Sequence, residues 1–345
     1  MSGRRGVITG GSFCVDFNKI IPHWPEEESA TPILDVQQGG GGPVWNLACD
    51  VKRLDPAMPI EAIALLGRDP YGDYLINELD RYHIGREQVK QIECGSTSFT
   101  DALCVSKTGK RTHFFSEGVN GEICPDHFDF SKTSVKIFHT GLPGIHKRLD
   151  AEWADCANGW QAVLKKAKAA GLVTNFELIT IEADRLAAII LPCLPYLDLL
   201  VLNDYEVGAL AGMTTTRLGG DTDIDAVKIA AQKVIAKGTM QHLVIHFPRA
   251  AFVVSRDGSE CLIPSVNIPQ SEIKGANGAG DAFAAGFLYG FHELWPIEKS
   301  VRLAHASAAA SLRNVSTVLG VEDWKACLTL ADQWGWRDIS LPPEK

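Results

Sequence analysis

The sequence has no apolar run of 18 residues, the length that a membrane-spanning helix needs. Its N-terminal stretch, MSGRRGVITGGSF, lacks a signal-peptide pattern, so we expect a cytoplasmic protein with no membrane partner. Basic tracts are also absent, and the net charge of −9 argues against a nucleic-acid partner. Small phosphorylated ligands remain possible, because local backbone amides hold them and net charge does not.

Paired cysteine motifs are missing as well. The nine cysteines are odd in number and scattered, without any C-x-x-C pair, and the ten histidines form no H-E-x-x-H motif. Scattered cysteines of this kind indicate reduced thiols in a cytosolic protein. We therefore expect neither a disulfide framework nor a structural metal site.

A regular alternation of strands and helices is present. With 345 residues and 46% apolar content, the chain can bury a large core. Short apolar stretches that read as strands alternate with amphipathic stretches that read as helices. Such strands, separated by helices, predict an α/β protein whose mostly parallel sheet is covered on both faces. The predicted strands are 7–15, 60–66, 135–139, 172–176, 197–202 and 242–246, and the predicted helices are 43–54, 153–170, 183–191 and 226–237.

Two regions depart from this alternation. Residues 31–36, 100–106 and 112–116 are short, polar-alternating strands with no helix between them, which predicts a small antiparallel sheet projecting from the body. The inserted segments are about 17–40 and 95–120. Such a sheet can act as a flap that closes over a site and excludes water, or it can be an edge hairpin with no dynamic role.

The segment 274–289, KGANGAGDAFAAGFLY, carries the strongest chemical signal. Gly278, Ala279 and Gly280 precede Asp281 at the start of an apolar helix. A helix start with bare amides can hold an anion, and a carboxylate beside it can accept a proton. This pairing suits phosphoryl transfer to a hydroxyl, although an ordinary tight turn with an N-capping aspartate gives the same pattern. The glycine spacing is not that of a dinucleotide fingerprint.

Three other places offer polar groups to a ligand. The glycine run 39–42 comes one turn before Asn46, whose amide can both donate to and accept from sugar hydroxyls, unless the run is simply a flexible loop. Asp16 ends the first predicted strand, where a doubly wound sheet presents ligand groups, although such an aspartate is often only solvated. Asn203 and Glu206 have the spacing of a capping box.

Taken together, these motifs resemble the ribokinase-like (PfkB) family of carbohydrate and nucleoside kinases. The run Asn277-Gly-Ala-Gly-Asp281-Ala-Phe283 is similar to the family's C-terminal signature, and Gly41-Gly42-x-x-x-Asn46 to its N-terminal one. The stretch 66–73 and the N-x-x-E motif at 203–206 follow in the family's order, so the resemblance covers about residues 6–320. It implies one ribokinase-like, three-layer αβα domain over 1–345, with the small sheet as a lid that often also pairs two subunits. A homodimer is therefore expected.

The resemblance also implies roles for individual residues. Asp281 is then the general base, and the run 278–280 is the anion hole for the transferring phosphoryl group. Mg²⁺ is expected to be held through water near Asn203 and Glu206. The acceptor is expected to contact Asp16, Gly41, Gly42 and Asn46.

Several positions depart from the family pattern. Where the family has a Thr-x-Gly-x-x-Gly loop beside the triphosphate, this chain has residues 246–251, HFPRAA, in which Arg249 could act as a charged clamp. Gly275 and Ala276 replace an Asp-Thr pair, which makes activation by a monovalent cation doubtful. The small-residue helix 301–310 resembles the one bordering the adenine pocket, with His305 near the base. Asn277 resembles a variant of nucleoside-kinase-like members and, like Arg249 and His305, is expected to contact the nucleotide.

The resemblance therefore implies an ATP-dependent, Mg²⁺-requiring kinase that phosphorylates a primary hydroxyl of a small sugar or sugar-like molecule. Two alternatives remain open. A nucleoside kinase would need an aromatic slot for a base, for which Phe13, Trp24 and Trp45 are candidates. A catalytically silent, ligand-binding homologue would account for the altered loop at 246–251 and for the missing Asp-Thr pair.

Overall fold

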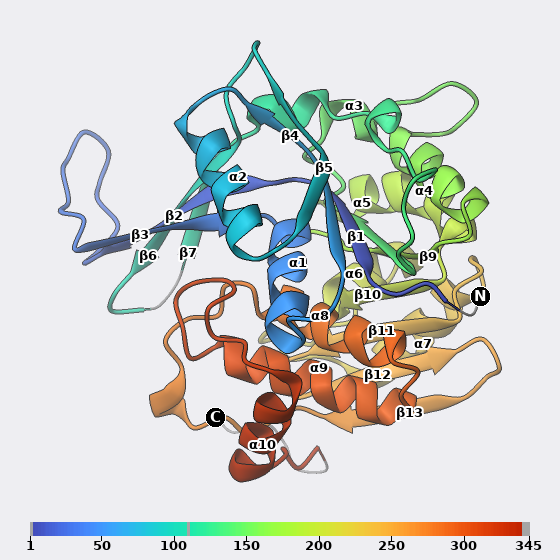
Figure 1. Cartoon of the computed structure of the whole chain (residues 1–345). Helices are drawn as coiled ribbons and strands as arrows, with labels where there is room; N and C mark the ends of the chain where they lie inside the picture. The colour runs from blue at the N-terminus through green and yellow to red at the C-terminus, as the bar shows by residue number, and fades with distance from the viewer. Residues whose placement is uncertain (1–2, 109–110, 340–345) are drawn as a thin grey trace.

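A nine-stranded sheet forms the centre of the protein. The computed structural model describes residues 3–108 and 111–339 (Figure 1). The strand order is β13-β12-β11-β10-β9-β8-β1-β4-β5, and all neighbours are parallel except the β11-β12 and β12-β13 pairs. The mostly parallel sheet expected from the sequence is thus confirmed. Its strands are β1 (Val7–Gly11), β4 (Ile60–Gly67), β5 (Gly85–Ile92), β8 (Ile137–Gly141), β9 (Val173–Phe176), β10 (Leu199–Asn203), β11 (His242–Phe247), β12 (Ala250–Ser255) and β13 (Glu260–Pro264).

Helices cover both faces of this sheet and give three layers. Successive residues of a strand point to opposite faces, so Val7 joins the core under one helical layer and Ile8 the core under the other. The first layer contains α1 (Pro43–Leu54), α2 (Pro70–Arg81), α8 (Ala279–His292), α9 (Ile297–Ser311) and α10 (Trp324–Trp334). The second contains α4 (Gly159–Ala169), α5 (Ala183–Ile190), α6 (Asp204–Ala211) and α7 (Ile224–Ile235), and a short α3 (Lys147–Asp150) precedes α4.

A second, four-stranded sheet projects from the body, as Figure 1 shows on the side of α2. Its order is β3-β2-β6-β7, from β2 (Cys14–Ile21), β3 (Asp35–Gly41), β6 (Phe99–Val105) and β7 (Arg111–Ser116). The outer pairs are antiparallel and the central β2-β6 pair is parallel. The strand expected at 31–36 begins later, at Asp35, and the glycines 39–41 lie in β3 instead of a loop.

The single strand predicted over 7–15 is wrong. The chain leaves the large sheet after Gly11, whose φ of 142° suits glycine, and it enters the small sheet at Cys14. A side chain at position 11 would also collide with the carbonyl oxygen of Gly141. Asp16 therefore belongs to the small sheet and is not at the carboxyl end of a strand in the large one.

Close packing of α8 against α9 fixes the helix that carries Asp281. A Cβ atom at Gly286 would lie 2.8 Å from Ala304 Cα, and one at Gly290 would lie 2.8 Å from Ser300 Cα. The two helix backbones therefore touch where α8 has no side chains.

All nine cysteines are free thiols. In the described part of the chain, the helices are too short or too polar to cross a membrane.

Candidate active site

The start of α8 presents free backbone amides. Gly278 precedes the helix with a φ of 77°, and Asp281 is the third helical residue. The first N–H that the helix uses internally is that of Ala282, which donates to the Gly278 carbonyl at 2.9 Å. The earlier amides, from Ala279 to Asp281, therefore have no acceptor within the helix and can receive an anion.

Asp281 faces a pocket of about 390 Å³ between the small sheet and the body, which we call pocket A. Several separate parts of the chain contribute to it, including the small sheet, the start of α1, the start of α8 and the segments that follow β8 and β9. The residues expected to bind the acceptor are brought together here, except that Gly41 lies behind the wall. The polar lining of pocket A includes Asp16, Gly42, Asn46, Glu117, Glu177, Asn277, Gly278, Gly280 and Asp281.

Asp281 is almost fully buried and is held by two neighbours. Asn46 Nδ2 donates to Asp281 Oδ2 at 2.6 Å, and the Glu177 carboxyl group is hydrogen-bonded to the Asp281 carboxyl group. Burial raises the pKa of Asp281 well above its usual value, the charge of Glu177 raises it further, and the Asn46 hydrogen bond opposes both effects. A carboxylate with a raised pKa is a stronger base than an exposed one.

Asp16 reaches pocket A from β2. Its carboxylate occupies the space that a side chain at Gly41 would need, so the glycine at 41 makes room for it. Cys14 Sγ donates to Asp16 Oδ1 at 3.3 Å. Burial raises the pKa of Asp16 to about 6, so it is mostly ionised at neutral pH and can accept hydrogen bonds from hydroxyl groups.

A second pocket, pocket B, lies on the other side of the α8 start and measures about 640 Å³. Gly280 lines both pockets, so the free amides lie where the two meet. Phe283 lies between two histidine rings, 4.9 Å from His246 and 5.1 Å from His305 between ring centroids. Burial lowers the pKa of His246 to about 4 and that of His305 to about 3, so both rings are neutral. Neutral rings and an apolar wall suit a flat heteroaromatic base.

Arg249 does not line pocket B. Its guanidinium donates to the Asp338 carbonyl at 3.0 Å, which directs it toward the C-terminal segment. The arginine that does line the pocket is Arg337, whose Nε is buried without a hydrogen-bond partner in the described structure. An unused guanidinium donor at a pocket wall is suited to a phosphate or a ribose oxygen.

Asn203 and Glu206 form the predicted capping box at the start of α6. Asn203 Oδ1 accepts from the Glu206 N–H and Glu206 Oε2 accepts from the Asn203 N–H, each at 2.9 Å. Asn203 lines pocket B, and burial raises the pKa of Glu206 to about 7. No group of three metal-ligating side chains occurs within residues 3–108 and 111–339. Oxygen donors of this kind fit a magnesium ion held mainly by water and nucleotide phosphates.

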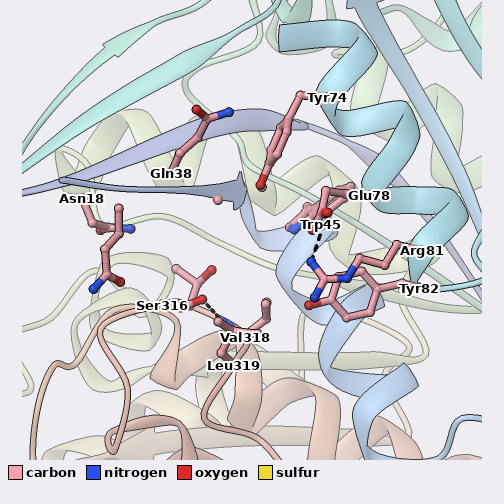
Figure 2. Close-up of a pocket in the computed structure, with 14 residues that line it drawn as sticks. Asn18, Gln38, Trp45, Tyr74, Glu78, Arg81, Tyr82, Ser316, Val318 and Leu319 are labelled. Carbon is pink, nitrogen blue, oxygen red and sulfur yellow. Dashed lines mark hydrogen bonds and ion pairs between the residues drawn. The ribbon is translucent and has the colours of Figure 1, made fainter.

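The aromatic side chains expected to form a base slot lie elsewhere. Phe13 is fully buried against Trp45, with ring centroids 5.4 Å apart, and Trp24 stacks on Phe114 on the small sheet. Trp45 lines a separate cavity of about 130 Å³ enclosed by the small sheet, α1, α2 and residues 316–319 (Figure 2). The aromatic residue that lines pocket A is Phe115.

Glu177, the acidic neighbour of Asp281, was not predicted from the sequence. It directly follows Phe176, the last residue of β9, at the edge where parallel strands present ligand groups. The same rule had selected Asp16, so applying it to every predicted strand would have found Glu177.

Comparison with known proteins agrees with this geometry. The family model "pfkB family carbohydrate kinase" matches residues 7–324. An ATP-dependent ribose-1-phosphate kinase of Halopiger xanaduensis is 25% identical, covering 88% of this chain and 90% of that protein. An adenosine kinase of Saccharomyces cerevisiae is 26% identical, covering 80% and 78%. The structure of ribokinase from Giardia lamblia has the same fold, with a TM-score of 0.78 at 16% identity over 96% of this chain and 100% of that one.

The fold, the buried carboxylate and the free amides between two pockets define a phosphotransferase that uses an alcohol group as acceptor. More particularly, the chain belongs to the pfkB family of carbohydrate kinases.

Proposed function

We propose that the protein transfers the γ-phosphoryl group of ATP to a primary hydroxyl of a small, uncharged sugar or sugar-like molecule. The observation that carries this proposal is the position of Asp281 and Gly280 at the start of α8, where pocket A and pocket B meet. A phosphoryl group entering from pocket B then lies beside free amides, and a hydroxyl entering from pocket A lies beside a carboxylate.

In this proposal the residues divide the work as follows. Asp281 accepts the proton of the acceptor hydroxyl, and the N–H groups of residues 279–281 donate to the oxygens of the moving phosphoryl group. Asp16, Gly42 and Asn46 orient the acceptor, while the wall around Phe283 and His305 holds the adenine. Magnesium, when bound near Asn203 and Glu206, supplies positive charge that offsets the charge of the phosphates.

The charge of pocket A points to a neutral acceptor. Four carboxylic residues line it, namely Asp16, Glu117, Glu177 and Asp281, and its described lining includes no lysine or arginine. An anionic acceptor would bring its charge close to Asp16 without a cation to compensate. Repulsion between two such charges amounts to roughly 2–4 kcal/mol at close range, or about 100-fold in affinity.

An acceptor panel tests this charge preference. With Mg·ATP, we expect ADP release with neutral pentoses, hexoses or nucleosides, and kcat/KM for ribose 1-phosphate or for sugar acids about 100-fold lower than for the best neutral acceptor. Asp16→Asn should reduce this discrimination because it removes one negative charge. Equal or better turnover of a phosphorylated acceptor by the native protein would contradict the proposal.

Nucleosides are the second candidate acceptors, favoured by the rest of the pocket A wall. Phe115, Leu142, Ile145, Leu178 and Ile179 form an apolar surface that sugar hydroxyls do not need and a base could cover. The same panel separates the two classes. Absence of ADP release with every acceptor, while ATP still binds, would instead support the catalytically silent homologue.

We further propose that the small sheet acts as the lid and joins two copies of the chain. Ile33, Leu34, Val36 and Phe114 are each more than half exposed on or beside its strands, more apolar surface than a monomer usually leaves in water. Light scattering should give twice the chain mass of 37.5 kDa. The double variant Val36→Glu and Phe114→Glu should give the monomer mass, and a native monomer would refute the dimer.

A cytoplasmic location remains our prediction, consistent with the free thiols.

A further inference from the structure

A row of polar side chains crosses the large sheet below Asp281. Thr9 on β1 is paired with His139 on β8, and His139 is paired with Asn175 on β9, so the three lie side by side. All three are fully buried. The residue two positions before each of the three is apolar and packs in the core that contains α1 and α8. Residues two apart in a strand point to the same face, so the row of polar side chains also faces these helices. Polar residues in this position are unusual, because central strands of a parallel sheet are normally apolar.

The row leads directly to the candidate base. Asn175 Nδ2 lies 2.9 Å from His139 Nδ1, and His139 Nε2 lies 3.0 Å from Glu177 Oε2. Glu177 in turn is hydrogen-bonded to Asp281. A continuous series of polar contacts therefore runs from Asn175 through His139 and Glu177 to Asp281.

Several atoms along this series have spare hydrogen-bonding capacity. In the described part of the chain, His139 Nε2 and Glu177 Oε2 have no hydrogen-bond partner other than each other at that 3.0 Å separation. Thr9 Oγ1 and Asn175 Oδ1 are also buried without a partner. Because buried polar atoms are nearly always paired, such a cluster indicates groups that hold protons or water.

We propose that Glu177 is the proton partner of Asp281: the two carboxyl groups hold one proton between them, the charge of Glu177 keeps that proton on Asp281, and Asp281 becomes the free base when the pair loses it. This inference rests on the proposed kinase function. The acceptor O–H bond breaks, its proton passes to Asp281, and its electron pair forms the new O–P bond. The bond from phosphorus to the leaving oxygen of ADP breaks with its electron pair. Glu177 acts through Asp281 and is therefore a positioning residue.

Electrostatics agree with one shared proton. Burial raises the pKa of Glu177 to about 7, opposed by its hydrogen bond to Asp281, and nearby Glu206 raises it further. Two neighbouring buried carboxylates cannot both ionise easily, so the pair titrates as one unit. Burial lowers the pKa of His139 to about 3, so it is a neutral neighbour of the pair.

The other titratable groups around the pair are acidic. Asp16 faces Asp281 from β2, and Asp50 faces it from α1, one turn after Asn46. Burial raises the pKa of Asp50 well above its usual value, and the charge of Asp281 raises it further. The positive charge of the nearby Arg53 opposes this rise and lowers the pKa of Asp50. The positive charges near the pair are thus too few to ionise both carboxyl groups.

The first test is the pH profile of kcat/KM in Glu177→Gln. Glutamine keeps the shape of glutamate but carries no charge, and its amide can donate to Asp281. The pKa of Asp281 therefore falls, and its ionised form persists to lower pH. We expect the acid limb to move down by at least one pH unit, so that activity at pH 5.5 relative to pH 8 rises about tenfold.

Asp50→Asn is the matched control. It removes a buried carboxyl group of the same cluster that makes no hydrogen bond to Asp281, so the acid limb should move far less than in Glu177→Gln. A Glu177→Gln profile that coincides with the native one would overturn the proposal. A reduced but unshifted profile would also overturn it, because that result assigns Glu177 only a structural role.

A second measurement needs no turnover. A carboxyl group whose pKa is raised in the folded state binds more protons there than in the unfolded chain between about pH 4.5 and 7, so stability falls as pH rises through that window. The native Tm should therefore decline with rising pH more steeply than the Tm of Glu177→Gln. Equal slopes would overturn the shared proton. If no acceptor gives ADP release, the kinase proposal fails while this measurement still decides the proton pair.

Discussion

Asp281→Asn is expected to lower kcat by about 10²–10⁴-fold, the range that a positioned general base contributes. The asparagine keeps the shape of the side chain but cannot accept the hydroxyl proton. ATP binding should persist, because pocket B and the free amides of α8 do not change. The measurement is ADP release under saturating Mg·ATP with the best acceptor of the panel, together with nucleotide affinity by calorimetry.

The thermal stability of Asp281→Asn is the control for this variant. Asp281 is buried and its raised pKa shows that the surroundings disfavour its charge. An uncharged asparagine should therefore leave the Tm unchanged or raise it, which separates loss of chemistry from loss of structure. A variant that retains more than a tenth of native kcat would refute the base assignment and favour a mechanism carried by the amides alone.

The anion site at the start of α8 could be predicted because the residues that indicate it are neighbours in sequence. A helix start and an open anion site next to Asp281 are indicated by Gly278, Ala279 and Gly280. The helix α1 was predicted with its observed bounds for a similar reason, since Pro43 and the preceding glycine mark its beginning. Features of this kind depend on neighbours in sequence and need no knowledge of the fold.

Long-range contacts explain what was not predicted. The break after Gly11 depends on the carbonyl of Gly141, and it moves Asp16 from the large sheet to the small one. Glu177 becomes significant only because α8 brings Asp281 beside it. The sequence around Arg337 and Arg249 does not show which of the two reaches pocket B. The path of the C-terminal segment places Arg337 there. Strand β5, GREQVKQI, was missed because an edge strand can be polar on both sides.

Asn46 links the base to the acceptor, and a single replacement separates its two roles. Its Nδ2 donates to Asp281, its Oδ1 has no hydrogen-bond partner in the described structure, and the residue lines pocket A. Asn46→Asp keeps an acceptor oxygen but replaces the donor with a second carboxyl oxygen next to Asp281. The hydrogen bond lost is one to a charged group, worth about 1.5–3 kcal/mol, or roughly 10–150-fold in rate.

The pH dependence of Asn46→Asp should be opposite in sign to that of Glu177→Gln. A new like charge raises the pKa of Asp281 further, so the base is protonated over a wider range and the acid limb of kcat/KM moves to higher pH. The deficit should therefore be largest near pH 6 and shrink above pH 8. Asn46→Ala loses both roles, so its acceptor KM should rise as well. An Asn46→Asp deficit that is constant with pH would mean that Asn46 orients the acceptor without tuning the base.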